Sequence, residues 1–194
     1  MRSTQSWHCA TQARIIVNME ALLLRPTTPA DSTALLSLYE DVAATPNSGL
    51  ARHRDEVDRG YVDAFAGLRD PLGLSIAALD GQRVVGEIHA VRMRPRQFRH
   101  VLTDLTVAVH PRMQGRGVGS RLFDALFEAA AGLTPPVTRI ELVARTGNAA
   151  AIRLYERLGF RAEGRFAGRV HLPDGSIEDD VPMARIAKPA RGSV

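Results

Sequence analysis

The stretch VAVHPRMQGRGVGSR, from Val107 to Arg121, decides the fold of this chain. A β-branched run ends at His110-Pro111, and a glycine-rich turn follows it. An amphipathic helix then begins, because apolar residues recur four apart at Val118, Leu122 and Leu126. The first N–H groups of a helix have no partner within the helix, and the helix dipole makes that end positive. Since glycine permits close approach, the stretch predicts a site for a phosphate-bearing ligand.

Two common phosphate-binding motifs do not fit this turn. A P-loop requires Gly-Lys followed by Ser or Thr, but the only lysine of the chain is Lys188. A dinucleotide-binding turn requires G-x-G-x-x-G or a final Ala, and the spacing from Gly115 and Gly117 places Ser120 last. That motif also requires an acidic residue about twenty positions further on, and residues 133–138 contain none. Both interpretations are therefore disfavoured.

A third pattern, Gln/Arg-x-x-Gly-x-Gly/Ala, is met by Gln114, Gly117 and Gly119. On its own it also fits a turn that opens a helix and binds no ligand. A second motif, NAAAIRLYERLGF at 148–160, follows a strand-like run. In this order and spacing, the two motifs resemble those of the GNAT superfamily of acyl-CoA-dependent N-acetyltransferases. The resemblance covers residues 22–186.

Periodicity and turn signals place the other elements. Asp80-Gly81 between two strand-like runs predicts a hairpin, and Asp31 is expected to cap a helix. We expect the α/β fold that the resemblance implies, a mixed, mostly antiparallel sheet of about seven strands with helices on both faces. The expected strands are 22–26, 75–79, 83–88, 102–109, 139–143, 160–170 and 177–185, the last two joined at 173–175, and the helices begin near 31, 55, 118 and 148.

The length and composition fit one self-sufficient domain. A chain of 194 residues, with 45% hydrophobic and 24% charged residues, is typical of a globular protein with its own core. We expect the acetyltransferase domain at 19–188 and a short tail at 189–194. Residues 1–18 lack the apolar core of a signal peptide, so we expect a dispensable arm or sequence upstream of the natural start.

Composition also limits the partners and the compartment. No apolar run approaches the roughly eighteen residues that span a bilayer, so no membrane role is expected. The single cysteine, Cys9, supports neither an internal disulfide nor a metal cluster, which favours a cytoplasmic protein without metal. The net charge is +4, but the basic residues are scattered apart from those at 92–99. We expect that cluster to be a solvated hairpin or loop, so nucleic acid is not the expected partner.

The resemblance implies how acetyl-CoA, the expected cosubstrate, is held. Main-chain groups of Val107 and Val109 would pair with the pantetheine arm as a neighbouring strand does. Asn148 caps the next helix, and the resemblance adds contact with the CoA arm. The pyrophosphate loop would comprise Gln114, Gly115, Arg116, Gly117, Val118, Gly119 and Ser120. The arginines of this stretch either meet the remaining phosphate charge or are surface side chains: Arg112, Arg116 and Arg121.

Two residues are expected to be catalytic. Tyr155 shares a helix face with Ile152 and Leu158, so the pattern alone predicts a core tyrosine. Its place in the second motif matches the tyrosine that, in many family members, lies near the CoA sulfur and protonates the leaving thiolate. An amine must also lose a proton before it attacks. Asp104, and Glu87 on the preceding strand, are the acids best placed to help, unless they are ordinary strand carboxylates.

The expected acceptor is a small primary amine. The segments at 163–165 and 178–185 resemble the branch of amino-acid, polyamine and ribosomal-protein N-acetyltransferases, and the match is best to L-amino-acid N-acetyltransferases. The helix pair and loop before residue 75 would wall the acceptor pocket. The alternatives are a protein N-terminal or lysine acetyltransferase, a polyamine acetyltransferase and a non-catalytic acyl-CoA sensor, the last disfavoured by Tyr155. Family members commonly form homodimers, so the resemblance also allows one.

Overall fold

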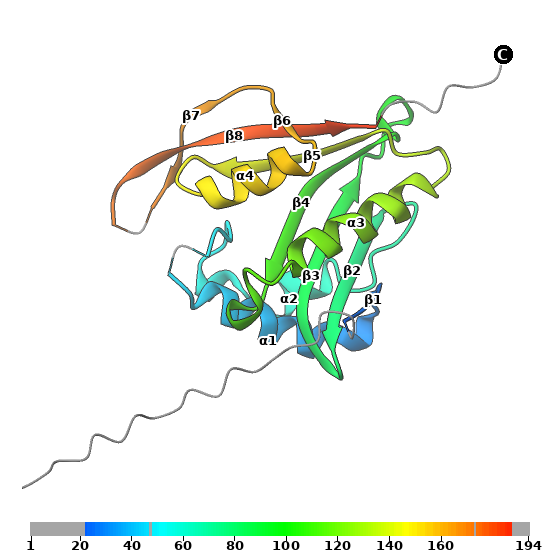
Figure 1. Cartoon of the computed structure of the whole chain (residues 1–194), viewed down its shortest axis with the longest axis horizontal. Helices are drawn as coiled ribbons and strands as arrows, with labels where there is room; N and C mark the ends of the chain where they lie inside the picture. The colour runs from blue at the N-terminus through cyan, green and yellow to red at the C-terminus, as the bar shows by residue number, and fades with distance from the viewer. Residues whose placement is uncertain (1–21, 47, 173, 188–194) are drawn as a thin grey trace, which may run out of the picture.

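The computed structural model describes residues 22–46, 48–172 and 174–187, which form one sheet with helices on both faces (Figure 1). The expected arm at 1–18, the tail at 189–194 and Pro173 of the last turn lie outside these residues. No helix within the described ranges is long and apolar enough to cross a membrane. The same ranges contain no group of three or more His, Cys, Asp or Glu side chains placed to hold a metal ion.

Eight strands make up the sheet: β1 (Leu23–Pro26), β2 (Gly73–Asp80), β3 (Arg83–Arg92), β4 (Val101–Val109), β5 (Arg139–Arg145), β6 (Arg161–Ala162), β7 (Phe166–His171) and β8 (Ile177–Ile186). Their order is β1-β2-β3-β4-β5-β8-β6, and β7 pairs with the first part of β8. Neighbouring strands are antiparallel except β4 and β5, which are parallel. The expected mixed, mostly antiparallel sheet is confirmed, with one strand more than predicted.

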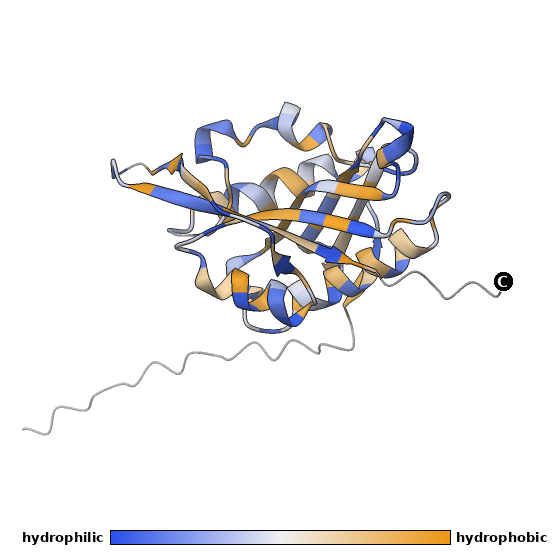
Figure 2. Cartoon of the chain, turned by 90° about the horizontal axis from the view of Figure 1, so that it is seen from above, coloured by the Kyte–Doolittle hydropathy of each residue, from blue (hydrophilic) through white to orange (hydrophobic). Residues whose placement is uncertain are grey.

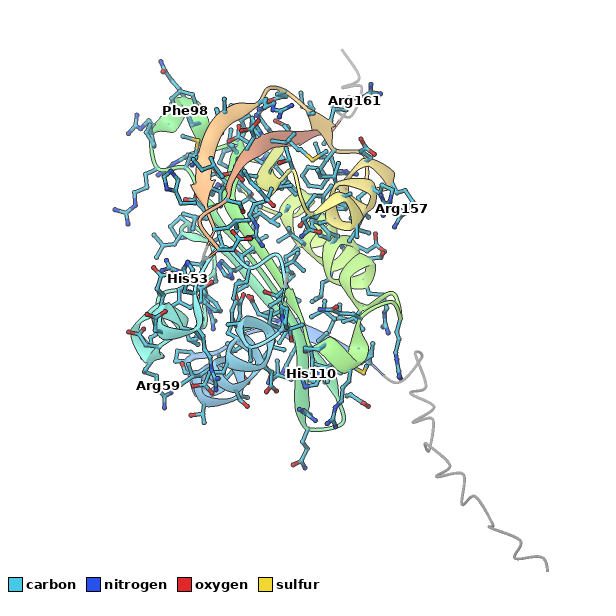
Figure 3. The ribbon with its side chains drawn as sticks, turned by 90° about the vertical axis from the view of Figure 1, so that its left-hand side faces the viewer. His53, Arg59, Phe98, His110, Arg157 and Arg161 are labelled. Atoms are coloured by element: carbon cyan, nitrogen blue, oxygen red, sulfur yellow. The ribbon has the colours of Figure 1, made fainter. Side chains whose placement is uncertain are left out.

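Four helices cover the sheet: α1 (Ser32–Ala43), α2 (Arg59–Asp63), α3 (Val118–Ala131) and α4 (Ala149–Arg157). Helices α1 and α2 lie on one face, and α3 and α4 lie on the other (Figures 1 and 2). In the side view, Arg59 of α2 and Arg157 of α4 project from opposite sides of the strands (Figure 3). The expected placement of helices on both faces is therefore confirmed.

Each face of the sheet has its own apolar core. On the α3 side, Leu122 and Leu126 are fully buried against Ile88 of β3, as the four-residue spacing predicts. On the α1 side, the fully buried Leu35 packs in a second cluster with Ala77 of β2. Alternate residues of the central strands thus point into different cores, which fixes the strand register.

Strands β4 and β5 start together and then separate. Their pairing is limited to Val101 with Arg139 and Leu102 with Ile140. Beyond these two pairs the strands diverge, as Figure 1 shows, while β5 remains paired with β8 along its whole length. One edge of β4 is thereby left open inside the sheet, facing the separated part of β5.

A β-bulge lies at the point of divergence. Val91 pairs with Thr103 and His89 pairs with Thr106, so three steps along β4 oppose two along β3. The extra residue on β4 lies next to Asp104, whose φ of 50° is the one left-handed value of a non-glycine residue in the described ranges. Bulges bend a strand and redirect its side chains, and many lie next to active sites.

Two element boundaries differ from the prediction. The helix expected from 55 to 68 is replaced by a 3-10 turn at Arg54–Glu56 and the five-residue α2, because Val57 between them is extended and buried. In the expected hairpin, Asp80 pairs with Arg83. The turn residues are therefore Gly81, with a φ of 59°, and Gln82, instead of Asp80-Gly81.

Asp31 stands at the N-cap position of α1, as predicted, but its carboxylate makes no capping hydrogen bond. Both carboxylate oxygens instead accept from the Arg25 guanidinium, at 2.7 and 2.8 Å. The main-chain N–H of Thr28 donates to the same carboxylate at 2.8 Å. These contacts hold the end of β1 against the start of α1.

The expectation that 92–99 is wholly solvated is wrong at Arg92. This side chain is 2% exposed, because its guanidinium lies where three connections meet. It forms an ion pair with Asp70 and donates to the carbonyl oxygens of Arg99, at 2.7 Å, and of Pro135. Main-chain oxygens satisfy the buried charge, as burial of an arginine requires. Residues 94–99 are largely exposed, as predicted.

Candidate active site

A cavity of about 910 Å³ lies where β4 leaves β5. Its floor is the β4 bulge, including Asp104, and His89 of β3 lies beside it. The segment before β2 forms one wall through Arg52, Tyr61 and Phe65. Of the helix pair and loop that were expected to wall a pocket, the loop and the α2 region line this cavity, whereas no residue of α1 does.

The main-chain groups of β4 alternate between β3 and the open edge. His110 N–H donates to the Val85 carbonyl at 3.0 Å, so this residue faces β3. Val107 and Val109 lie three residues and one residue before His110, and their N–H and C=O groups therefore point to the side where β5 has diverged. The Gln114 side-chain amide donates to the Val109 carbonyl at 3.2 Å. The main-chain groups of Val107 therefore lie on the open edge of β4.

The glycine-rich turn leads from β4 into α3. Gly115 and Gly117 have φ values of 72° and 79°, which other residues rarely adopt, and Gly117 is the N-cap of α3. A Cβ atom at Gly115 would meet nothing within 4 Å, so the turn faces open space. The Val118 side chain is 1% exposed, which leaves only its N–H group to take part in binding. The first turn of α3, through Ser120, therefore directs its N–H groups outward from the fold.

The arginines near this turn have different surroundings. Arg121 Nη2 donates to the Leu22 carbonyl at 3.1 Å, so it also holds the start of β1. Arg112 and Arg116 are exposed beside the turn, although Arg116 also makes contacts within the chain. Positive side chains thus surround the N-terminal end of α3, which suits a pyrophosphate or similar anion.

Asn148 caps α4, as predicted, because its side-chain oxygen accepts from Ala151 N–H at 3.1 Å. The same side chain contacts the segment between α1 and α2. A Cβ atom at Gly49 would lie 2.2 Å from Asn148 Nδ2, so a side chain there would displace the Asn148 amide. Gly49 also has a φ of 79°. The start of α4 and the cavity wall therefore meet across the gap between β4 and β5.

The two predicted catalytic residues lie in different surroundings. Asp104 is exposed at the bulge and lines the cavity. Tyr155 of α4 does not line it; its ring packs against Phe123 at 5.7 Å and Phe160 at 6.0 Å between centroids. Burial raises the pKa of Tyr155 to about 12, so its hydroxyl is protonated at neutral pH.

The profile of the acetyltransferase (GNAT) family matches residues 35–160. The chain belongs to this family. The matched range runs from α1 to the end of the second sequence motif, and so includes the open edge of β4 and the glycine-rich turn. The protein is therefore an acetyl-CoA-dependent N-acetyltransferase, which confirms the resemblance that the two motifs indicated.

This acetyltransferase is similar to two characterised relatives. It is 36% identical over 112 residues to L-amino acid N-acetyltransferase AaaT of Escherichia coli, an alignment that spans 57% of this chain and 66% of the relative. It is 30% identical over 146 residues to the L-methionine sulfoximine/L-methionine sulfone acetyltransferase of Pseudomonas aeruginosa strain PAO1, over 73% of this chain and 81% of the relative.

The fold of the acetyltransferase also matches solved structures. The Salmonella typhimurium protein yncA, solved with its cofactor acetyl-CoA, superposes with a TM-score of 0.72 at 23% identity, covering 89% of this chain and 97% of that one. The β4 edge, the open turn and the first turn of α3 agree with an acyl-CoA ligand, since they offer main-chain partners to an extended amide chain and N–H groups to phosphates.

A buried carboxylate lies beside the cavity of the acetyltransferase. Glu87 is 0% exposed and its two oxygens accept from different sides. Ser75 Oγ donates to Oε1 at 2.7 Å, and Tyr39 hydroxyl donates to Oε2 at 2.7 Å. Burial and the Glu87 charge raise the pKa of Tyr39 well above its ordinary value. Because Glu87 is enclosed, it does not itself meet an acceptor amine in the cavity.

Sequence reasoning missed His89, whose ring lines the cavity and whose Nδ1 lies 3.0 Å from Glu87 Oε2. Glu87 and His89 are two residues apart on one strand, so their side chains share a face. Polar residues at alternate positions of an otherwise apolar strand were the available signal. It did not identify Tyr39 and Ser75, which the fold brings to the same carboxylate.

Proposed function

We propose that this acetyltransferase transfers the acetyl group of acetyl-CoA to the amino group of a free amino acid bound in the cavity at the β4 bulge. The main observation in support of this acceptor is a cavity of about 910 Å³ that is lined by Asp104 and Arg52, among others. Volumes of this order are typical of small-molecule sites. The names of the two relatives, which concern L-amino acids and their analogues, support the same class of acceptor.

The charges of the cavity suit a zwitterion. Arg52 lies over the Tyr61 ring at 4.3 Å and forms no ion pair with a described carboxylate. Arg139, by contrast, is bound by Glu141 and Glu163. We therefore assign the acceptor carboxylate to Arg52, which presents a planar guanidinium, and its ammonium group to the side of Asp104.

The acyl-CoA would lie along the open edge of β4. Val107 and Val109 offer main-chain groups to the pantetheine amides, and Asn148 contacts the arm where α4 meets the cavity wall. The N-terminal turn of α3 binds the pyrophosphate through its N–H groups. The residues of that turn are Gln114, Gly115, Arg116, Gly117, Val118, Gly119 and Ser120.

Acetyl-CoA supplies the activated acetyl thioester, and the chain supplies positioning and proton transfer. Asp104 attracts the ammonium group of the acceptor. The Tyr155 hydroxyl, which is protonated at neutral pH, donates its proton to the departing sulfur. No metal enters this scheme. A cytoplasmic location, inferred from the composition, and a homodimer, inferred from the family, stay predictions.

Other acceptors are less well supported. A polyamine favours several unpaired carboxylates, and two of the cavity's acids, Glu141 and Glu163, are paired with Arg139. A protein N-terminus or lysine side chain would leave Arg52 without a carboxylate partner. A non-catalytic acyl-CoA sensor would not need the protonated Tyr155.

The proposal is tested by release of free CoA thiol in the presence of acetyl-CoA and a panel of amines. We expect turnover with L-amino acids, including methionine sulfone, and little with N-acetylated amino acids, peptides or polyamines. Thermal unfolding with acetyl-CoA, with NADH as control, checks the cosubstrate separately. Ligand at about one hundred times its Kd adds roughly 2.7 kcal/mol to the free energy of unfolding. Turnover confined to peptides would overturn the acceptor assignment but keep the acetyltransferase.

A further inference from the structure

We propose that His89 is the general base that takes the proton from the acceptor's ammonium group, and that Glu87 positions it. The proposal rests on the proposed function, because it assigns a residue to the amine side of the same reaction. Four observations support it. They are a chain of hydrogen bonds that ends on Glu87, the packing of the His89 ring, its place in the cavity lining and its position opposite the β4 bulge.

The hydrogen-bond chain starts at a group that can only donate. Gly67 N–H donates to Thr27 Oγ1 at 2.9 Å. The Thr27 hydroxyl donates to Ser75 Oγ, at 2.7 Å. The Ser75 hydroxyl in turn donates to Glu87 Oε1, at 2.7 Å. The chain thus ends on an oxygen of Glu87 that accepts.

The other oxygen of Glu87 accepts as well. Tyr39 hydroxyl donates to Oε2 at 2.7 Å, while its distance to His89 Nδ1 is a much longer 3.4 Å. Both oxygens of Glu87 thus act as acceptors. We therefore place the proton of the third contact on His89 Nδ1, which lies 3.0 Å from Oε2. In the neutral imidazole the Nε2 atom keeps its lone pair and is the basic nitrogen.

The ring of His89 is held firmly but reaches the cavity. It stacks on Phe65 with 4.0 Å between ring centroids and an angle of 11° between planes. The residue is 7% exposed and is one of those that line the cavity. Nε2 lies on the side of the ring away from Cβ and Glu87. His89 pairs across the strands with Thr106, immediately after the bulge, so the base stands opposite the reacting end of the cavity.

The proton transfers balance as follows. His89 Nε2 takes one proton from the acceptor ammonium, which leaves a neutral amine. The amine nitrogen forms a bond to the acetyl carbon while the carbon–sulfur bond breaks. The second proton leaves the attacking nitrogen as Tyr155 supplies a proton to the sulfur, so free CoA thiol and the amide are formed. His89 then releases its proton to solvent, and Tyr155 is restored by the second amine proton.

An imidazole suits this step better than an acid does. General bases work best when their basicity is near the working pH, and imidazoles as a class lie there, whereas carboxylates are several units less basic. Asp104 keeps its role in attracting the ammonium group. The titratable and charged groups that face His89 or share its cavity are Glu87, Tyr39, Tyr61, Asp104, Arg52, Glu56, Arg139, Glu141 and Glu163.

The direct test is His89→Asn. The asparagine side-chain nitrogen can take the place of Nδ1 and donate to Glu87, but it offers no counterpart to Nε2. We expect kcat at pH 7 to fall about 100-fold, with the affinity for acetyl-CoA unchanged. The deficit should shrink as the pH rises to 9.5, because a growing fraction of the acceptor is already the neutral amine. A kcat within about twofold of the parent value at pH 7 would overturn the proposal.

Two further variants separate base chemistry from folding. His171→Asn makes the same substitution at an exposed histidine of β7, and we expect it to leave kcat and its pH profile unchanged. Glu87→Gln keeps the size of the side chain but places an amide opposite Nδ1. An amide N–H there favours the tautomer that carries its proton on Nε2, so kcat should fall while the affinity for acetyl-CoA stays.

The tautomer itself can be measured without any acceptor. Long-range ¹⁵N–¹H spectra of the histidine-labelled protein at pH 8 should show His89 with its proton on Nδ1, and should show the proton on Nε2 in Glu87→Gln. A proton on Nε2 in the parent protein would overturn the proposal whatever the acceptor is. Failure of amino acids in the amine panel, with turnover of another amine, would overturn only the proposed acceptor. His89→Asn is then assayed with the amine that reacts.

Discussion

At the scale of single residues, Tyr155 illustrates how one side chain satisfies two requirements. The periodicity of α4 predicts a core tyrosine, and its ring does pack among Phe123 and Phe160. The sequence motif predicts a proton donor, and burial raises the pKa of the phenol to about 12. The phenol is protonated at neutral pH even without this shift, so packing of the ring is compatible with proton donation. A structural role and a chemical role do not exclude each other here.

For Tyr155→Phe we expect kcat to fall about tenfold or more, because the departing sulfur loses its proton donor. The phenyl ring keeps the packing, so the unfolding midpoint and the affinity for acetyl-CoA should stay close to those of the parent. Steady-state kinetics with both substrates saturating, together with thermal unfolding, check this. Undiminished kcat under these conditions would remove Tyr155 from the mechanism.

Structural roles that depend only on neighbouring residues could be predicted from the sequence. Asn148 as a helix cap and Gly117 in a tight turn follow from backbone geometry that a few neighbouring residues determine. The pairing of Glu87 with Tyr39 depends on contacts between distant parts of the chain. Such contacts leave no local pattern, which is why the buried network and His89 were not predicted.

At the scale of elements, the turn before α3 is where the predicted and observed conformations agree most closely. Its left-handed glycines give α3 an uncovered N-terminal end. Other elements were predicted less well. The bulge in β4 adds a residue, which places Leu102 and Leu105 in the same core although they are three apart. Alternation alone cannot anticipate such a change of face.

A matched pair of substitutions tests the turn. Gly115 and Gly81 have φ values of 72° and 59°, and a Cβ atom at either would meet nothing within 4 Å. We expect alanine at each to lower the free energy of unfolding similarly, by about 1–2 kcal/mol, since both adopt left-handed backbone. Only Gly115→Ala should weaken acetyl-CoA binding, about tenfold or more, because its methyl group projects towards the anion.

Isothermal titration with acetyl-CoA, compared with chemical denaturation of the same proteins, measures the two effects separately. Equal acetyl-CoA affinity in both variants would show that the open face of the turn does not bind the cosubstrate. Equal losses of affinity in both variants would instead point to a general effect of destabilisation.

At the scale of the whole molecule, the sheet class and the two helical layers were predictable because every major element carries its own periodicity. The order of the last strands was not. Strand β8 lies between β5 and β6, with β7 on the same edge of β8 as β6, and short strands of two to six residues carry little pattern of their own. The burial of Arg92 likewise depends on three connections that meet only in the folded chain.

The acid stability of the whole fold should depend on Asp31. The Arg25 guanidinium lowers the pKa of Asp31 from 3.8 to about 2, with help from Thr28. The folded-state pKa is below the unfolded value, so the stabilisation is fully present above pH 4 and is lost as the pH falls through 2. Allowing for solvent screening at the partly exposed Arg25, we expect it to amount to about 1 kcal/mol.

Urea denaturation from pH 7 to pH 2 checks this expectation. Asp31→Asn should lower the free energy of unfolding at pH 7 and should flatten its decline between pH 4 and pH 2. Asp63→Asn, at an exposed carboxylate of α2, is the control. Parallel pH curves for Asp31→Asn and the parent protein would contradict the assignment.

The internal edge of β4 has a consequence for self-association. An open strand edge on the outside of a protein invites pairing with strands of other chains, which is a common start of aggregation. Here the free edge faces β5 across a gap, with α3 and α4 on the adjoining face. A thin, flexible molecule can enter such a gap. A strand of another folded protein cannot, because the strands on either side of it in its own sheet would not fit. The acetyltransferase thus has unpaired main-chain groups on β4, and their position inside the sheet prevents strands of other proteins from pairing with them.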